Sequence, residues 1–288
     1  MNRKDKIKVP LTPGIVIWKL LKAIFYIAMI SAAFTFVFPF IWMLINSFKT
    51  GIEYAENVFS ISKTFDWDNY RQVIENLKYK NHGLFAMLWN SVKLVLWSAF
   101  ATLVFPHLAA YPLARFDFKG KKLLETTIWI SMVVPIIGAG SSTMWFLNAT
   151  GLYDSFAGVF LLSAAGLGFS QILLVSFYKG IAPAYAEAAY MDGASEWIIF
   201  RKIYYPQAMP LTLIFLVQSV ITVWNDYMTG YMYLPNHPTL ALGLQQMQAQ
   251  FVDFGADYPV MFAGIILAMI PVFIVYIMFS DKITNNIK

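Results

Sequence analysis

The stretch AIFYIAMISAAFTFVFPFIWMLI, residues 23–45, contains no charged side chain and decides the fold class of this chain. A helix rises about 1.5 Å per residue, so about 20 apolar residues in a row cross roughly 30 Å of hydrocarbon. Further apolar runs of similar length follow at residues 87–113, 123–146, 157–179, 209–231 and 259–280. The sequence therefore predicts an all-α integral membrane protein with six transmembrane helices.

The composition of the 288-residue chain agrees with a membrane environment. Hydrophobic residues make up 59% and charged residues only 13%, about half of the roughly 25% that is usual for a soluble domain. The net charge of +5 comes from basic residues scattered between the apolar runs, which argues against a nucleic-acid partner. The chain has no cysteine, so disulfides and thiolate chemistry are excluded.

The distribution of Lys and Arg predicts the orientation in the membrane. If both termini are cytoplasmic, most basic residues fall on the cytoplasmic side, as the positive-inside rule requires. The expected organisation is a cytoplasmic tail at 1–22, a first transmembrane helix at 23–45, an extracytoplasmic segment at 46–86, a core of transmembrane helices at 87–281, and a cytoplasmic tail at 282–288.

A short amphipathic helix is expected inside the extracytoplasmic segment. Asp68 is placed to cap it. Its apolar residues recur at helical spacing and form one face that lies on the membrane or on a partner; they are Tyr70, Val73, Ile74 and Leu77.

A polar segment, PAYAEAAYMDGASEWIIFRKIYYP at residues 183–206, separates the fourth and fifth apolar runs. Pro183 suits a helix start, and Gly193 permits the left-handed turn that ends a helix. Ala188 and Ala189 keep the helix surface low, so another backbone can approach closely. The segment thus predicts a short helix to which a partner can dock.

The second half of the same segment predicts a membrane-facing stretch. Trp197, Phe200 and Tyr204 recur on one helical face, which is expected to point toward the membrane. Pro206 disfavours helix at the preceding residue and predicts a break before the fifth transmembrane helix.

The segment resembles the signature loop of binding-protein-dependent ABC importer permeases. The shared pattern starts with Glu187-Ala188-Ala189 and has Gly193 after three residues and Ile203 after nine more. One further residue then precedes the bulky Tyr205 and Pro206. The family usually has Leu where this chain has Tyr205. The stretches Ala110 to Lys121, Asp192 to Ser195 and Trp224 to Asp226 are similar to the maltose-type, carbohydrate branch of the family.

This resemblance implies a type I ABC importer permease fold with a cytoplasmic coupling helix. The coupling residues would be Glu187, Ala188, Ala189, Asp192 and Gly193. The implied partners are a second homologous permease subunit, a dimer of cytoplasmic ATP-binding subunits, an extracytoplasmic solute-binding protein, membrane lipids and a carbohydrate substrate, an oligosaccharide or glycoside. The implied location is a bacterial or archaeal cytoplasmic membrane, crossed several times.

No enzyme motif accompanies the resemblance. The sequence has no Gly-x4-Gly-Lys-Ser/Thr loop to cradle a phosphate, so ATP and Mg are expected on the partner ATPase subunits and no cofactor on this chain. Its histidines lie far apart, without the spacing of metal ligands. We expect a transport subunit without catalytic activity.

Polar residues in the fifth apolar run suggest a route for the substrate. Gln218, Thr222, Asn225 and Thr229 follow helical spacing, with Asp226 beside them. A carboxylate near the bilayer centre costs about 2.5–3.5 kcal/mol, so Asp226 is expected to face water, a partner helix or a cation. Gln218, Thr222, Asn225 and Asp226 are the pathway candidates. The alternative is an interhelical hydrogen-bond clamp that holds the permease pair together.

Two other functions remain open from the sequence. One is an ABC importer permease for an amino acid, a peptide or another solute, against which the carbohydrate-branch patterns argue. The other is a membrane scaffold or an ion-coupled transporter that uses Asp226.

Overall fold

The structure is a computed structural model that describes residues 13–133, 138–164, 168–254 and 257–286. These residues are largely helical, with one short antiparallel hairpin of β1 (Lys78–Tyr79) and β2 (His82–Gly83). In chain order the helices are α1 (Pro13–Asn46), α2 (Gly51–Glu56), α3 (Asp68–Asn76), α4 (Leu84–Arg115), α5 (Lys121–Val133), α6 (Ala139–Ala149), α7 (Phe156–Ala164), α8 (Phe169–Gly180), α9 (Ala184–Met191), α10 (Glu196–Ile199), the π-helical turn η1 (Phe200–Tyr204), α11 (Tyr205–Trp224), α12 (Tyr227–Tyr233), α13 (Leu240–Phe254) and α14 (Tyr258–Asn286).

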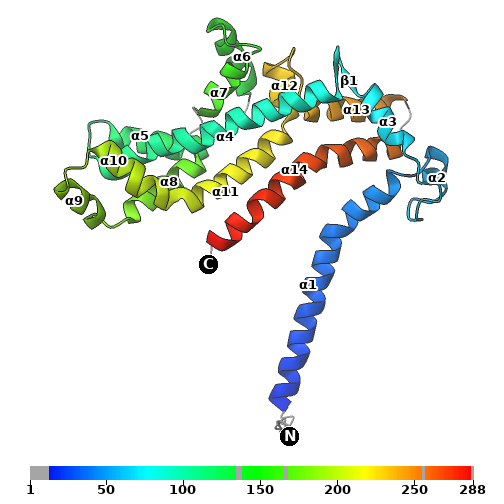
Figure 1. Cartoon of the computed structure of the whole chain (residues 1–288), viewed down its shortest axis with the longest axis horizontal. Helices are drawn as coiled ribbons and strands as arrows, with labels where there is room; N and C mark the ends of the chain where they lie inside the picture. Colours follow the sequence, from blue (N-terminus) through cyan, green and yellow to red (C-terminus); the bar gives the residue numbers. More distant parts are fainter. Residues whose placement is uncertain (1–12, 134–137, 165–167, 255–256, 287–288) are drawn as a thin grey trace.

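Helix α4 is the centre of the bundle. It packs against α7, α8 and α11, while α14 packs against α11, α13 and α3 (Figure 1). Helix α1 diverges from the bundle and meets it through α14 (Figure 1). Most of the long apolar surface of α1 is therefore left for lipid or for another chain.

The prediction of six transmembrane helices is confirmed only in part. Within the described residues, four helices are long and apolar enough to cross a membrane, and α7 with α8 make a bent fifth if they count as one. The predicted third span, 123–146, is divided between α5 and α6, and residues 134–137 lie outside the described part. The predicted fifth span, 209–231, is interrupted after Trp224.

The predicted tails differ from the observed helices. Helix α1 is described from Pro13, and proline is well tolerated in the first turn of a helix. Residues 13–22 are therefore helical, and residues 1–12 lie outside the described part. At the other end, α14 continues through Asn286, so residues 282–286 are also helical, while 287–288 are not described.

The amphipathic helix expected in the extracytoplasmic segment is α3. Asp68 is its first residue and not its cap, because the Asp66 Oδ1 accepts the Asp68 backbone N–H at 2.8 Å. Val73 and Leu77 are buried in a cluster with residues of α14, and Tyr70 packs against it, so most of the apolar face lies on this chain, whereas Ile74 is exposed. The spacing of apolar residues correctly predicted the helix α3, but spacing alone does not show which part of the protein covers its apolar face.

Buried polar side chains tie the end of α1 to this segment. The Asn69 amide donates to the backbone oxygens of Ser47 at 2.9 Å and Lys49 at 2.8 Å. The Lys49 ammonium donates to the Asn57 carbonyl at 2.8 Å, and burial lowers the pKa of Lys49 from its ordinary value. The buried side-chain nitrogens of Asn69 and Lys49 are thus paired within the segment, as burial requires, whereas the buried Asn46 Oδ1 has no hydrogen-bond partner among the described residues.

The break predicted before the fifth transmembrane helix is wrong. The helix is continuous from Glu196 to Trp224. At its π-helical turn the Tyr205 N–H donates to the Phe200 carbonyl, five residues earlier. This wider turn makes room for the Pro206 ring, which lacks a donor and would clash in a regular helix.

The face predicted to meet the membrane is mostly inside the protein. The rings of Phe200 and Tyr204 are buried, with centroids 4.9 and 5.1 Å from the Tyr111 ring of α4. Trp197 alone is exposed. The helical spacing was right, but spacing alone cannot distinguish lipid from a neighbouring helix.

A hydrogen-bonded chain joins α8, α4 and α11 through His107. The Tyr178 hydroxyl lies 2.5 Å from the His107 Nδ1, and the Thr212 hydroxyl lies 2.8 Å from its Nε2. Since Thr212 donates its one hydrogen to the Ala208 carbonyl, it accepts from Nε2–H, and Nδ1 accepts from Tyr178. His107 is a structural residue that links three helices.

Replacing Thr212 with Val should therefore destabilise the protein. The change leaves the buried Nε2–H of His107 without an acceptor, which costs about 1–3 kcal/mol. Thermal unfolding of the purified chain in detergent measures the loss. Thr222→Val is the matched control, because Thr222 is exposed on the same helix and has no hydrogen bond to the residues that the structure describes. Equal melting temperatures for the two variants would contradict the assignment.

Candidate functional site

The short helix and turn predicted at residues 183–193 are confirmed. Helix α9 follows Pro183, and Gly193 adopts a left-handed φ of +76°. The N–H of Gly193 donates to the Tyr190 carbonyl and the N–H of Ala194 to the Ala189 carbonyl, both at 2.9 Å. These two bonds are the pattern that commonly closes a helix C-terminus, and they need the left-handed residue between them.

The predicted coupling residues divide between two faces of α9. Ala189 is half-buried and packs against the core of the chain, to which the buried Ala186 belongs. Glu187, Ala188 and Asp192 face outward and are exposed.

Large apolar side chains surround this outward face. Met191 is 88% exposed, Tyr185 57% and Trp197 58%. Glu187 has no hydrogen bond or ion pair within the part of the chain that the structure describes. Helices α9 and α10 lie at one end of the molecule (Figure 1). An exposed apolar patch with a free carboxylate is a surface suited to docking a partner.

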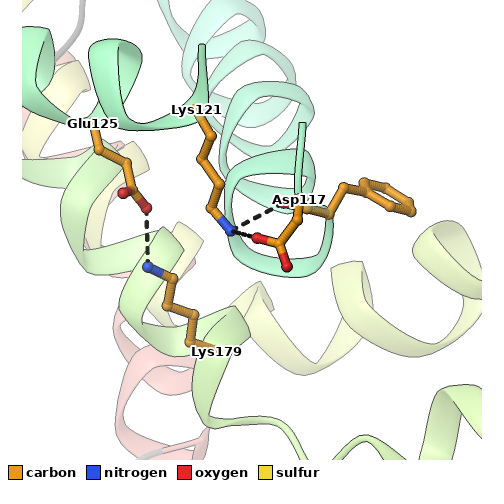
Figure 2. A network of polar contacts seen from close by, with 5 residues as sticks. Asp117, Lys121, Glu125 and Lys179 are labelled. Carbon is orange, nitrogen blue, oxygen red and sulfur yellow. Dashed lines mark hydrogen bonds and ion pairs between the residues drawn. The ribbon is translucent and has the colours of Figure 1, made fainter. Parts of the chain in front are cut away.

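Ion pairs fix the helices next to this end. The Lys179 ammonium of α8 lies 3.0 Å from the Glu125 carboxylate of α5. Lys121 contacts the Asp117 carboxylate and the Phe116 carbonyl, both at 3.0 Å (Figure 2). These contacts hold the turn between α4 and α5 and join α5 to α8.

The carboxylate of Glu196, which was not selected in the sequence analysis, is hydrogen-bonded to the last turn of α9. The Glu196 Oε2 accepts from the Tyr111 hydroxyl at 2.8 Å, and its Oε1 accepts from the Tyr190 hydroxyl. Tyr111 is 85 residues away in sequence, so no local motif could reveal the contact.

Two of the four pathway candidates line a polar cavity of about 300 Å³ between α4, α8 and α11. Gln218 and Thr222 of α11 are exposed there and have no hydrogen bond among the described residues. The polar residues that share the cavity are Thr102, Ser170 and Ser219. Thr102 and Ser170 were not among the predicted candidates.

Asn225 lines a second cavity of about 610 Å³, together with the rings of Trp224 and Tyr227. Gln245 and Gln248 of α13 also line it, and the rest of the wall is formed by apolar residues of α13 and α14 and by Phe40 of α1. The Gln245 Oε1 is buried and has no hydrogen-bond partner among the described residues. The two glutamines escaped the sequence analysis because α13 was not predicted.

The predicted single polar stripe is wrong, because α11 ends at Trp224 and α12 begins at Tyr227. Asp226 caps α12: its Oδ1 accepts the Thr229 N–H at 3.0 Å and its Oδ2 accepts the Thr229 hydroxyl at 2.5 Å. The positive N-terminus of α12 also favours the carboxylate. Both carboxylate oxygens of Asp226 therefore have a hydrogen-bond donor within the chain.

The described residues contain no group of three His, Asp or Glu side chains that could hold a metal ion. The buried His107 is fully used by its two hydrogen bonds.

Comparison with known proteins identifies a family. The profile described as "Binding-protein-dependent transport system inner membrane component" matches residues 102–286. The "Diacetylchitobiose uptake system permease protein NgcG" of Streptomyces coelicolor is 26% identical over 255 residues, which cover 88% of this chain and 82% of that protein. The "Probable starch degradation products transport system permease protein AmyC" of Thermoanaerobacterium thermosulfurigenes is 27% identical, covering 86% and 89%.

A solved structure shares the fold. The crystal structure of a bacterial ABC transporter involved in the import of the acidic polysaccharide alginate contains a chain that matches with a TM-score of 0.77. The match is 21% identical and covers 95% of this chain and 99% of that one.

The capping role of Asp226 can be tested by substitution. Asp226→Ala removes both hydrogen bonds to Thr229 and should lower the free energy of unfolding by about 1 kcal/mol. Asp226→Asn keeps a capping oxygen and should unfold close to the wild-type temperature. Thermal unfolding of the purified chain measures the stability of both variants. If Asp226→Ala and Asp226→Asn are destabilised equally, the negative charge of Asp226 matters and the capping oxygen does not.

Proposed function

The chain belongs to the family of binding-protein-dependent transport system inner membrane components, and from that membership we propose that it is a carbohydrate-importing permease subunit. It would work with a second homologous permease, a dimer of cytoplasmic ATP-binding subunits and an extracytoplasmic solute-binding protein. In this proposal both termini are cytoplasmic, in a bacterial or archaeal membrane. ATP and Mg belong to the partner subunits, and this chain performs no catalysis.

The observation that carries the proposal is the exposed face of α9. Met191 and Tyr185 are apolar and exposed, and Glu187 is unpaired among the described residues. Such side chains become favourable once a partner covers them, because the apolar area leaves water and the carboxylate finds a donor. We assign α9 as the coupling helix, with Glu187, Ala188 and Asp192 on the contact face and Gly193 as the turn that presents it. Ala189 supports the helix from the inner side.

The pathway assignment rests on unpaired polar groups at membrane depth. Gln218 and Thr222 lie on a helix long and apolar enough to span the bilayer, yet both are exposed and without hydrogen bonds. Polar groups in that position face protein or a water-filled cavity and not lipid. We propose that they line the route together with Asn225. Asp226 then acts as the cap that fixes the break between α11 and α12 and so positions Asn225.

The carbohydrate assignment combines the relatives with the cavity chemistry. NgcG and AmyC are named for diacetylchitobiose and for starch degradation products. The amides and hydroxyls of the smaller cavity suit sugar hydroxyls, and the rings of Trp224 and Tyr227 at the larger one suit the apolar faces of a sugar ring.

An ion-coupled transporter that uses Asp226 fits less well. The hydrogen bonds from Thr229 to both oxygens of Asp226 already explain this carboxylate as the cap of α12, so its presence in the sequence needs no transported cation.

Reconstitution in vesicles tests the function. The vesicles contain this chain, its partner permease, the ATPase subunits and the binding protein. They should take up a labelled oligosaccharide only when ATP is present on the side of the membrane where the ATPase subunits lie. Uptake driven by a proton or sodium gradient without the ATPase subunits would overturn the importer assignment. Uptake of amino acids but of no saccharide would overturn the carbohydrate assignment alone.

Substitutions at Gly193 should separate turn geometry from side-chain size. An added Cβ meets nothing within 4 Å, so only the left-handed φ of +76° opposes a larger residue. Gly193→Val should misplace α9, because a β-branched residue disfavours this conformation by more than about 1–2 kcal/mol. Uptake per ATP hydrolysed should fall strongly. Gly193→Asn is the matched control, since Asn tolerates the left-handed region; if both variants import equally well, the turn is not required for coupling.

The double substitution Gln218→Leu with Thr222→Val should lower saccharide uptake roughly fivefold to tenfold. This is about the effect of losing one hydrogen bond between the protein and the saccharide at the rate-limiting step. Association of the two permease subunits should remain, because no interhelical bond of this chain is lost. Thr35→Val is the control: this α1 hydroxyl bonds only within its own helix. Loss of the permease pair with the double variant would instead favour the interhelical clamp.

A further inference from the structure

Helix α9 is weakly attached to the rest of the chain. Ala186 and Ala189, which offer only methyl groups, are the side chains of α9 that pack against the core. The turn that follows α9 centres on Gly193, and the added-Cβ position there is in open space. Besides the chain connections to α8 and α10, a helix held in this way needs a stronger side-chain contact to pass a displacement directly to the bundle.

Glu196 supplies that contact. Its two carboxylate oxygens accept from two tyrosines on different helices, Tyr190 in the last turn of α9 and Tyr111 near the end of α4. Hydrogen bonds to an ionised carboxylate are roughly twice as strong as neutral ones. Glu196 is half-buried, so these bonds are partly shielded from water.

The α4 side of the contact is rigid. Tyr111 is buried, and its ring packs against Phe200, Tyr204 and Tyr178 with centroid distances of 4.9, 5.1 and 6.0 Å. The Arg115 guanidinium lies over the Tyr204 ring at 5.1 Å. The hydroxyl of Tyr111 is thus a fixed point in the core of the bundle.

Glu196 is also the first residue of the continuous helix that ends at Trp224. That helix carries Gln218 and Thr222, while α4 carries Thr102, and all three line the 300 Å³ cavity. A movement of α9 that is passed on at Glu196 therefore reaches two walls of the same cavity.

We infer that Glu196 is the positioning residue that joins the coupling helix to α4 and α11, so that displacement of α9 moves the walls of the polar cavity. The inference rests on the proposed function for its transport readout. Its structural part, the attachment of α9 by Glu196, stands independently of that function.

The first experiment measures the attachment in the purified permease. The chain has no cysteine, so Met191→Cys gives one site for a spin label on the exposed end of α9. Adding Glu196→Ala should make the label more mobile. The control is Tyr276→Phe, because the Tyr276 ring is exposed on α14 and its hydroxyl has no hydrogen bond within the described residues. Equal mobility in the Glu196→Ala and control backgrounds would overturn the attachment.

The second experiment measures coupling in the complete reconstituted complex. Glu196→Ala, Tyr111→Phe and Tyr190→Phe should each lower the number of saccharides imported per ATP hydrolysed. For Glu196→Ala the loss should be about fivefold or more, the low end of coupling between distant sites. Tyr111→Phe added to Glu196→Ala should cause little further loss, because both remove the same contact. Glu196→Gln keeps an acceptor and should recover part of the ratio.

The outcomes separate the two levels of the proposal. If the wild-type complex shows no ATP-driven uptake, the proposed function fails and the role of Glu196 in coupling fails with it. If the wild type is coupled and Glu196→Ala has the same uptake per ATP, only the role of Glu196 is overturned. A loss of uptake that matches the loss of folded complex, at an unchanged ratio, also overturns it, since a merely structural residue behaves in that way.

Discussion

The requirement that backbone amides and carbonyls find partners inside the protein governs this structure. Hydrocarbon offers no hydrogen bonds, so a chain at membrane depth is helical wherever lipid can reach it, and each interruption needs its own partners. At the interruption after α11, the Asp226 side chain accepts the free N–H of Thr229. At Pro206 the wider turn lets the Tyr205 N–H reach the Phe200 carbonyl. The interruption after α11 lies next to the pathway candidate Asn225, and the wide turn lies next to Glu196. In both places the irregular backbone keeps its hydrogen bonds within the protein.

Local features were the ones that the sequence predicted well. Gly193 was identified as the turn because a left-handed residue is required one position beyond a helix end, and the residues involved are neighbours. The apolar runs gave most of the long helices because their periodicity and length are properties of single segments. The errors came from competition between local rules and the surroundings. Pro206 disfavours a helix locally, yet burial of Phe200 and Tyr204 against Tyr111 keeps the helix continuous.

Contacts between distant parts of the chain could not be predicted from spacing. The Glu196 to Tyr111 bond joins residues 85 apart, and the cavity around Gln218 takes its other walls from α4 and α8. The predicted polar stripe failed for a similar reason. Gln218, Thr222 and Asn225 follow helical spacing, but periodicity does not reveal that the helix ends at Trp224. Because the end of the helix was misplaced, Asp226 was expected to face water, a partner helix or a cation, and its role as the cap of α12 was missed.

The π-helical turn at residues 200–204 has a consequence for the evolution of the family. Such a turn contains one residue more than a regular helix needs, and each residue rotates a helix by about 100°. A chain that lost one residue here would regain a regular helix, but α10 and α9 would swing by more than a quarter turn about the axis of α11. Glu196 would then point away from Tyr111, and α9 would expose a different side. Point substitutions should therefore accumulate in this turn more readily than single-residue deletions among related chains.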